Sequence, residues 1–294
     1  MWNAGSFTEG VAVSPGGTIY FSDIPFNKSP GRVMKFDPAT GKTRVHCKDS
    51  GKSNGLMFDA KGRLIAACGA MWGRQALVEI TPDGKVKPLV EKYRGKRLNS
   101  PNDLVVHPKG WIYFSDPRYA GDEPVEIPHM SVYRYDPKDG RIARVTRDIE
   151  KPNGVGVSPD GKTLYVAETN NGSTDVRKKT KTPKRGRMTL NAFPIRKDGT
   201  LGRKRVLVDF GGDVGTDGMT VDVKGNIYCA VRSEKRHGII VYSPTGKQRA
   251  YIPTPELPTN CCFGKGRQAT TLYVTAGKGL YRITLKIAGF HPAG

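Results

Sequence analysis

An all-β, six-bladed β-propeller is the fold that this sequence predicts, because one phrase recurs along the chain and because helix-breaking residues are abundant. The phrase is a polar residue, usually followed by Gly, then an apolar run, a turn and a second apolar run. Its six copies begin at Glu9, Asn54, Asn102, Asn153, Asp217 and Asn260. Gly and Pro number 36 and 21 among 294 residues, which argues against long helical bundles since both residues break helices.

Each copy of the phrase has the form of a hairpin, two short apolar runs joined by a turn that contains Gly. A second hairpin follows in most copies, as in Arg32 to Gly41, Ala76 to Gly84 and Val132 to Gly140. Four strands in roughly 48 residues are typical of a propeller blade, and six blades of that size occupy residues 1–294 as a single domain. A β-sandwich would not repeat one phrase six times, and a solenoid would show shorter repeats.

A basic insertion is expected in the fourth blade, at about residues 170–188, because the interval from Asn153 to Asp217 is the longest between copies. It contains the run Arg177 to Arg187. Residues 177–205 hold twelve Lys or Arg and a single acid, Asp198. The simplest interpretation is a solvated loop. The alternative is contact with a polyanion through Arg177 to Arg187, or attraction of anionic substrates.

Composition excludes several classes of protein. The chain carries 48 basic and 27 acidic residues, a net charge of +21, and no apolar run approaches the ~18 residues of a membrane span. Five cysteines without a C-x-x-C pair indicate buried thiols rather than disulfides or zinc. No signal peptide is visible at the N-terminus. The expected location is therefore cytoplasmic, or periplasmic or secreted if the N-terminus has been trimmed; the oligomeric state is not predicted.

A cation site is predicted on the propeller axis. The first strand of each blade lines the central channel, so the six residues that open the phrase would face one another at one mouth. Two carboxylates and four amides give this ring a charge of −2 and only oxygen donors, which suits Ca²⁺ better than Zn²⁺. The alternative is that each residue merely caps a turn, since Asn-Gly and Asp-Gly favour turns.

Several phrases resemble the SMP-30/gluconolactonase family over essentially the whole chain: Phe7-Thr-Glu9-Gly, Asn99-Ser-Pro-Asn102-Asp-Leu, Tyr113-Phe-Ser-Asp116-Pro-Arg-Tyr119, Lys151-Pro-Asn153-Gly and Thr216-Asp217-Gly-Met. The resemblance implies a six-bladed propeller with catalytic Ca²⁺, for which another divalent cation can substitute. It implies Glu9, Asn102, Asn153 and Asp217 as metal ligands and Asp217 as the catalytic group that orients water. We expect Asn54, Asn102, Tyr119 and Asn260 to contact substrate.

The function implied is a calcium-dependent hydrolase that opens a lactone ring, with the metal as Lewis acid on the carbonyl. A diisopropylfluorophosphatase-like phosphotriesterase is the alternative within the family, because both reactions use the same metal. A non-enzymatic interaction propeller is the third hypothesis. Animal members carry Arg two residues before the Asn of the third blade, where this chain has Ser100, so the resemblance does not specify a sugar lactone.

Overall fold

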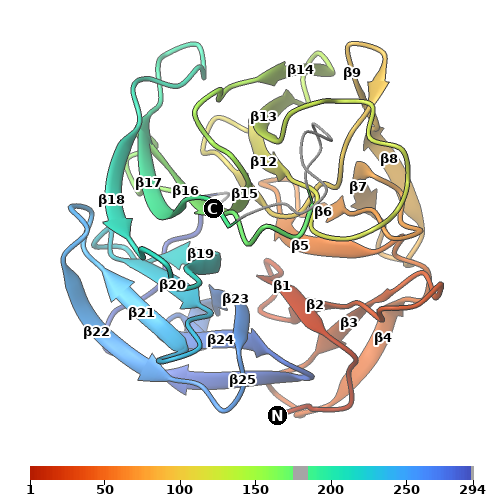
Figure 1. Cartoon of the computed structure of the whole chain (residues 1–294). Helices are drawn as coiled ribbons and strands as arrows, with labels where there is room; N and C mark the ends of the chain where they lie inside the picture. The colour runs from red at the N-terminus through yellow and green to blue at the C-terminus, as the bar shows by residue number, and fades with distance from the viewer. Residues whose placement is uncertain (175–184, 293–294) are drawn as a thin grey trace.

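Six antiparallel sheets stand in a ring around a central axis, as Figure 1 shows. The structure is a computed structural model that describes residues 1–174 and 185–292. Each sheet runs in chain order from an inner strand outward, and five of the six have four strands. The predicted six-bladed propeller is therefore confirmed.

The first three blades hold these strands: β1 (Thr8–Val13), β2 (Ile19–Asp23), β3 (Arg32–Phe36) and β4 (Thr43–Cys47); β5 (Ser53–Phe58), β6 (Leu64–Cys68), β7 (Ala76–Ile80) and β8 (Val86–Val90); β11 (Leu104–Val106), β12 (Ile112–Asp116), β13 (Ser131–Asp136) and β14 (Arg141–Arg144). A two-stranded ribbon, β9 (Lys92–Tyr93) and β10 (Lys96–Arg97), lies between the second and third blades in the sequence.

The last three blades hold these strands: β15 (Pro152–Val157), β16 (Thr163–Thr169), β17 (Met188–Pro194) and β18 (Arg205–Asp209); β19 (Thr216–Val221), β20 (Ile227–Val231), β21 (Gly238–Tyr242) and β22 (Gln248–Pro253); β23 (Pro258–Phe263), β24 (Thr271–Ala276) and β25 (Gly279–Thr284). The only helix among the described residues is the 3-10 turn η1 (Gly266–Gln268). No helix in these ranges is long and apolar enough to cross a membrane.

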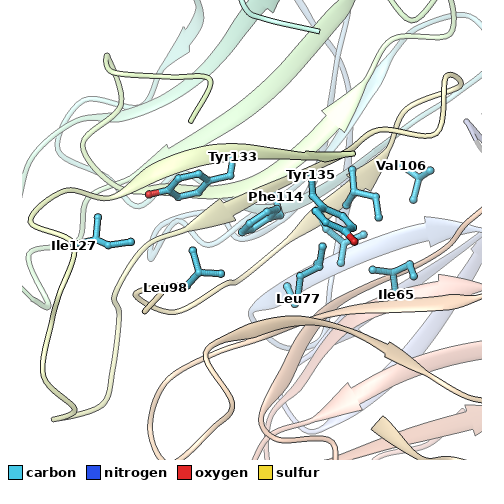
Figure 2. Packing of buried hydrophobic residues seen from close by; sticks show 11 residues of the cluster. Ile65, Leu77, Leu98, Val106, Phe114, Ile127, Tyr133 and Tyr135 are labelled. Carbon is cyan, nitrogen blue, oxygen red and sulfur yellow. The ribbon is translucent and has the colours of Figure 1, made fainter. Parts of the chain in front are cut away.

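The hydrophobic core lies between neighbouring blades. Figure 2 shows the cluster between the second and third blades, in which Ile65 and Leu77 face Phe114 and Tyr133. The rings of Phe114 and Tyr133 stack with their centroids 5.6 Å apart. Every blade packs on the next in this way, because alternate residues of each strand point to opposite faces of the sheet.

The ring closes between the sixth blade and the N-terminal segment. The sixth sheet has three strands, and Trp2 forms an isolated antiparallel bridge with Leu280 of β25. In Figure 1 the N-terminus lies beside β25. The Trp2 ring packs on Phe21 of the first blade, 5.1 Å between centroids. Backbone hydrogen bonds from Gly5 to Lys278 and from Thr8 to Gly277 add to this bridge, and the apolar cluster between the first and sixth blades completes the closure.

Four glycines follow the axial position on the inner strands and let those strands approach one another closely: Gly10, Gly55, Gly154 and Gly218. A Cβ on Gly154 would overlap the carbonyl oxygen of Asp217 and lie 2.9 Å from the Cα of Gly218. In the third and sixth blades this position holds Asp103 and Asn260 instead. Their side chains occupy the space that the glycines leave, since a Cβ on Gly55 would overlap Asp103 and one on Gly218 would overlap Asn260.

Substitution of Gly154 by Ala is expected to lower the free energy of unfolding by roughly 1–3 kcal/mol, because the added methyl group meets backbone that cannot move alone. Gly16→Ala is the matched control: Gly16 lies in an open turn with no atom within 4 Å of the new Cβ, and its backbone needs no positive φ. Urea denaturation of the two variants would measure the difference. Equal stabilities would contradict close packing at the axis.

Candidate functional site

Five of the six side chains predicted to ring the axis line one cavity of about 490 Å³ at one end of the channel. They are Glu9, Asn54, Asn102, Asn153 and Asp217. Tyr119, which was predicted to contact substrate, lines the same cavity. Glu9, Asn153 and Asp217 are buried, whereas Asn54 and Asn102 are partly exposed.

The inner strands aim these side chains through a shared irregularity. Glu9 pairs with Ser22 of β2, and the register then shifts before Ala12. Equivalent shifts follow Ser53, Pro152 and Thr216 in the second, fourth and fifth blades. A β-bulge re-aims the side chains around it, and here it occurs near the axial residue in five blades, since the sixth has a register shift between Pro258 and Asn260. The repeated phrase of the sequence thus corresponds to a repeated backbone shape.

The prediction that Asn260 faces the same mouth as Glu9 is wrong, because this side chain is not among the residues of the cavity that holds Glu9. It lines a second cavity of about 300 Å³, formed by other residues, together with Asp103. The register explains the difference: Thr8 and Thr216 pair with the last residue of the neighbouring strand, and in the sixth blade Pro258 does so. Thr259 therefore holds the axial position, and Asn260 lies one residue beyond it.

Asp103 is a buried titratable group that the sequence analysis did not identify. Burial raises the pKa of its carboxyl to about 7, against hydrogen bonds that lower it. The carboxylate accepts from the backbone N–H of Leu104 at 2.9 Å and of Val155 at 3.3 Å. The side chain of Asn260 also hydrogen-bonds to it. Asp103 and Asn260 thus form a second polar layer one residue beyond the ring of Glu9 and Asp217.

Glu9 and Asp217 form a pair of buried, interacting carboxyl groups. Burial raises the pKa of Glu9 well above its usual value, and the charge of Asp217 raises it further. Burial likewise raises the pKa of Asp217, while the positive charge of Arg232 and a hydrogen bond from Asn153 lower it. Arg232 Nη1 lies 3.4 Å from Asp217 Oδ2. Nearby positive charge therefore stabilises the ionised form of both carboxyl groups, and Arg232 supplies part of it.

Tyr119 lies in the loop after β12 and reaches across to the fourth blade. Its hydroxyl donates to the carbonyl oxygen of Thr169 at 3.0 Å. Burial raises its pKa well above the usual value, with the charge of Asp217 adding to the effect and a hydrogen bond with Asn153 opposing it. The Tyr119 hydroxyl therefore stays protonated, and its hydrogen bond with Asn153 holds the amide group that in turn bonds to Asp217.

Two cationic residues of the cavity wall, Arg232 and Lys52, were missed by sequence reasoning. Arg232 directly follows β20, and Lys52 directly precedes β5. The signal present in the sequence was a basic residue immediately next to an apolar strand, at the end that faces the ring. It was not recognised because basic residues are common throughout this chain.

The donors fit a hard cation. Among residues 1–174 and 185–292, no group of three or more His, Cys, Asp and Glu side chains is arranged to hold a metal ion. A cation here would therefore be held by two carboxylates and neighbouring amide oxygens. That donor set suits Ca²⁺, and an added positive charge would favour the ionised forms of Glu9 and Asp217, whose pKa values burial raises.

The interval between β16 and β17 contains the expected basic insertion, and most of Arg177 to Arg187 falls outside the described residues. Its described end is not a free basic surface. Arg187 pairs with the buried carboxylate of Glu168 at 2.9 Å. Arg185 lines the cavity of Glu9 and lies 3.5 Å from Glu234. The end of the insertion is therefore part of the cavity rim.

Comparison with known proteins identifies the family of the chain. The chain is 28% identical to a gluconolactonase of Zymomonas mobilis over 98% of its length and 80% of that protein. It is 26% identical to the diisopropyl-fluorophosphatase of Loligo vulgaris, with coverage of 91% and 84%. A solved gluconolactonase of Xanthomonas campestris superposes with a TM-score of 0.80 at 29% identity, covering 98% of this chain and 88% of that one. Residues 7–278 match the SMP-30/Gluconolactonase/LRE-like region, and the chain belongs to this family.

Proposed function

We propose that the protein is a hydrolase that opens a lactone ring with the help of a divalent cation, Ca²⁺ being the expected one. The observation that carries the proposal is the buried pair Glu9 and Asp217, which faces a cavity large enough for a small cyclic ester beside Asn102 and Asn153. A family whose members include named gluconolactonases supports the reaction class.

Lactone hydrolysis adds water to the ring carbonyl carbon and breaks the bond to the ring oxygen, which takes a proton, to give a hydroxy acid. In the proposed reaction Asp217 orients the attacking water and accepts its proton. Asn153 and Tyr119 hold the Asp217 carboxyl in place through hydrogen bonds at Asn153. Asn54 and Asn102, both partly exposed, present amide groups to the substrate.

Glu9, Asn102, Asn153 and Asp217 would hold the cation. When bound, it would polarise the lactone carbonyl and balance the negative charge that develops on its oxygen. Without a cation, the carboxyl with the raised pKa keeps its proton in the fold at pH values where the unfolded chain has released it. The folded state therefore loses stability as pH rises through that raised pKa.

Phosphotriester hydrolysis is the second candidate, favoured by the similarity to a diisopropyl-fluorophosphatase. The same residues would serve, because both reactions direct water at an electrophilic centre next to a polarised oxygen. A pH-stat panel of lactones, with diisopropyl fluorophosphate as a parallel substrate and with and without chelator, separates the two reactions. Hydrolysis of lactones alone would exclude the phosphotriesterase, and turnover that survives chelation would contradict the role of the cation.

Calcium is expected to raise the melting temperature of the wild-type protein, because a ligand that binds only the folded state stabilises it. Glu9→Gln should lose most of this increase. In chelator at pH 8 the same variant should melt higher than wild type, since it removes a buried carboxylate that repels Asp217. A gain of 1 kcal/mol corresponds to about 2–4 °C in a domain of some 200 residues.

Glu91→Gln is the matched control for thermal melting, since Glu91 is exposed and lies away from the cavity. It should keep the calcium response of the wild type. A wild-type melting temperature that does not change with millimolar Ca²⁺, together with metal analysis that finds no divalent ion, would refute the cation site.

Asp217→Asn is expected to keep the fold and to lower kcat for lactones by roughly 10² or more at saturating Ca²⁺, the usual scale for losing acid–base assistance. Asp209→Asn in the neighbouring fourth blade is the control, because that side chain is exposed and, among the described residues, accepts a bond from the backbone N–H of Gly211 alone. Initial rates at several calcium concentrations would distinguish lost metal affinity from lost chemistry. Near-wild-type turnover in Asp217→Asn would place the catalytic group elsewhere.

A further inference from the structure

One wall of the Glu9 cavity carries two positive charges joined by aromatic rings. The Arg232 guanidinium lies over the ring of Phe7 at 5.7 Å, and Phe7 contacts Phe26 with ring centroids 5.2 Å apart. Phe26 belongs to the loop whose carbonyl oxygens at Pro25 and Asn27 accept hydrogen bonds from the Lys52 ammonium. We call Arg232, Phe7, Phe26 and Lys52 the cationic wall; all four line the cavity.

Among the described residues, Arg232 is the one cation of this wall that faces a carboxylate, and that carboxylate, Asp217, also interacts with Glu9. Lys52 is buried, and in the described part of the chain its ammonium contacts backbone carbonyls rather than an acid. For Arg232, the one carboxylate within ion-pair distance among the described residues is Asp217. Its other polar contact is a long hydrogen bond of 3.5 Å to the carbonyl oxygen of Pro258.

The charges of the whole cavity show what a bound cation would change. Its described lining contains three bases and three acids, namely Lys52, Arg185, Arg232, Glu9, Asp217 and Glu234. The formal charge is therefore zero without a metal ion and +2 with a divalent one. Binding at Glu9 and Asp217 would also take from Arg232 most of the negative charge that now faces it. The loaded site would then favour an anion at Arg232.

We propose that the substrate is a lactone bearing an anionic substituent, a carboxylate or a phosphate, and that Arg232 binds this substituent; the inference rests on the proposed cation-dependent hydrolysis. A guanidinium is suited to the task because its planar fork matches both oxyanions. Contact with Phe7 holds the fork in position. Arg232 lies only 3.4 Å from Asp217. An anionic substituent bound to Arg232 would therefore lie close to the reacting carbonyl, at a separation that a small lactone ring can span.

The kinetic test compares 6-phosphogluconolactone and a glucarolactone with neutral gluconolactone at saturating Ca²⁺. The wild type should have the higher kcat/KM for at least one anionic lactone. Arg232→Gln should lower the ratio of anionic to neutral kcat/KM by roughly tenfold or more, chiefly through KM, and Arg232→Lys should lie between. Arg249→Gln, an equal change of charge on the exposed outer strand of the same blade, should leave the ratio as in wild type.

If no lactone is hydrolysed, the proposed function is refuted. A binding experiment then still tests whether Arg232 binds an anionic substituent. Calorimetric titration with 6-phosphogluconate, glucarate and gluconate, each with Ca²⁺ present, measures the preference for the added anion directly. Tighter binding of phosphogluconate or glucarate that Arg232→Gln abolishes would support the cationic wall; phosphate and carboxylate are distinguished by which of the two binds. Equal binding of all three, or a preference unchanged in a folded Arg232→Gln protein, would overturn it.

Discussion

The close approach of six inner strands to one axis is the constraint on which the rest of this structure depends. The sheets of a propeller are widely spaced at the rim and close together at the centre. The residue next to the axis must therefore be Gly or have a side chain that fills the space between neighbouring strands and hydrogen-bonds there. Four blades meet this requirement with Gly, and two use Asp103 and Asn260, whose polar atoms bond to each other and to the adjoining strand. Everything polar in the site is built on that packing.

The buried acids show how function and stability oppose each other on this axis. Glu9 and Asp217 would be less costly to fold as amides, because both carboxyl groups lie in a poorly solvated place and repel one another. The fold tolerates them because Arg232 and the Asn153 amide offset part of the cost. A cation would favour the ionised form of both carboxyl groups, which is the argument for the proposed cation site.

The blade repeat could be predicted from the sequence because turn chemistry and alternating apolar runs are local properties. The shared location of Glu9, Asn153 and Asp217 could be predicted as well, because residues at equivalent positions of the inner strands face the same end of the channel. Asn260 failed for a physical reason: the pairing of β23 puts Thr259 at the axial position, so Asn260, which opens the sixth copy of the phrase, lies one residue further along, where four other blades have Gly. Arg232 and Lys52 could not be assigned because their positions depend on contacts with Pro258, Phe7 and the loop of Pro25, which lie far from them in sequence.

The second polar layer also divides the channel. The cavity of Glu9 and the cavity of Asn260 share no lining residue, and the far one is lined in part by Phe290 to Pro292 near the C-terminus. The layer of Asp103 and Asn260 therefore separates the two cavities along the axis. In the proposed reaction, substrate, attacking water and hydroxy acid would all pass through the mouth of the Glu9 cavity. The hydroxy acid would then have to leave before the next lactone could bind. The hydroxy acid would therefore inhibit competitively with respect to the lactone.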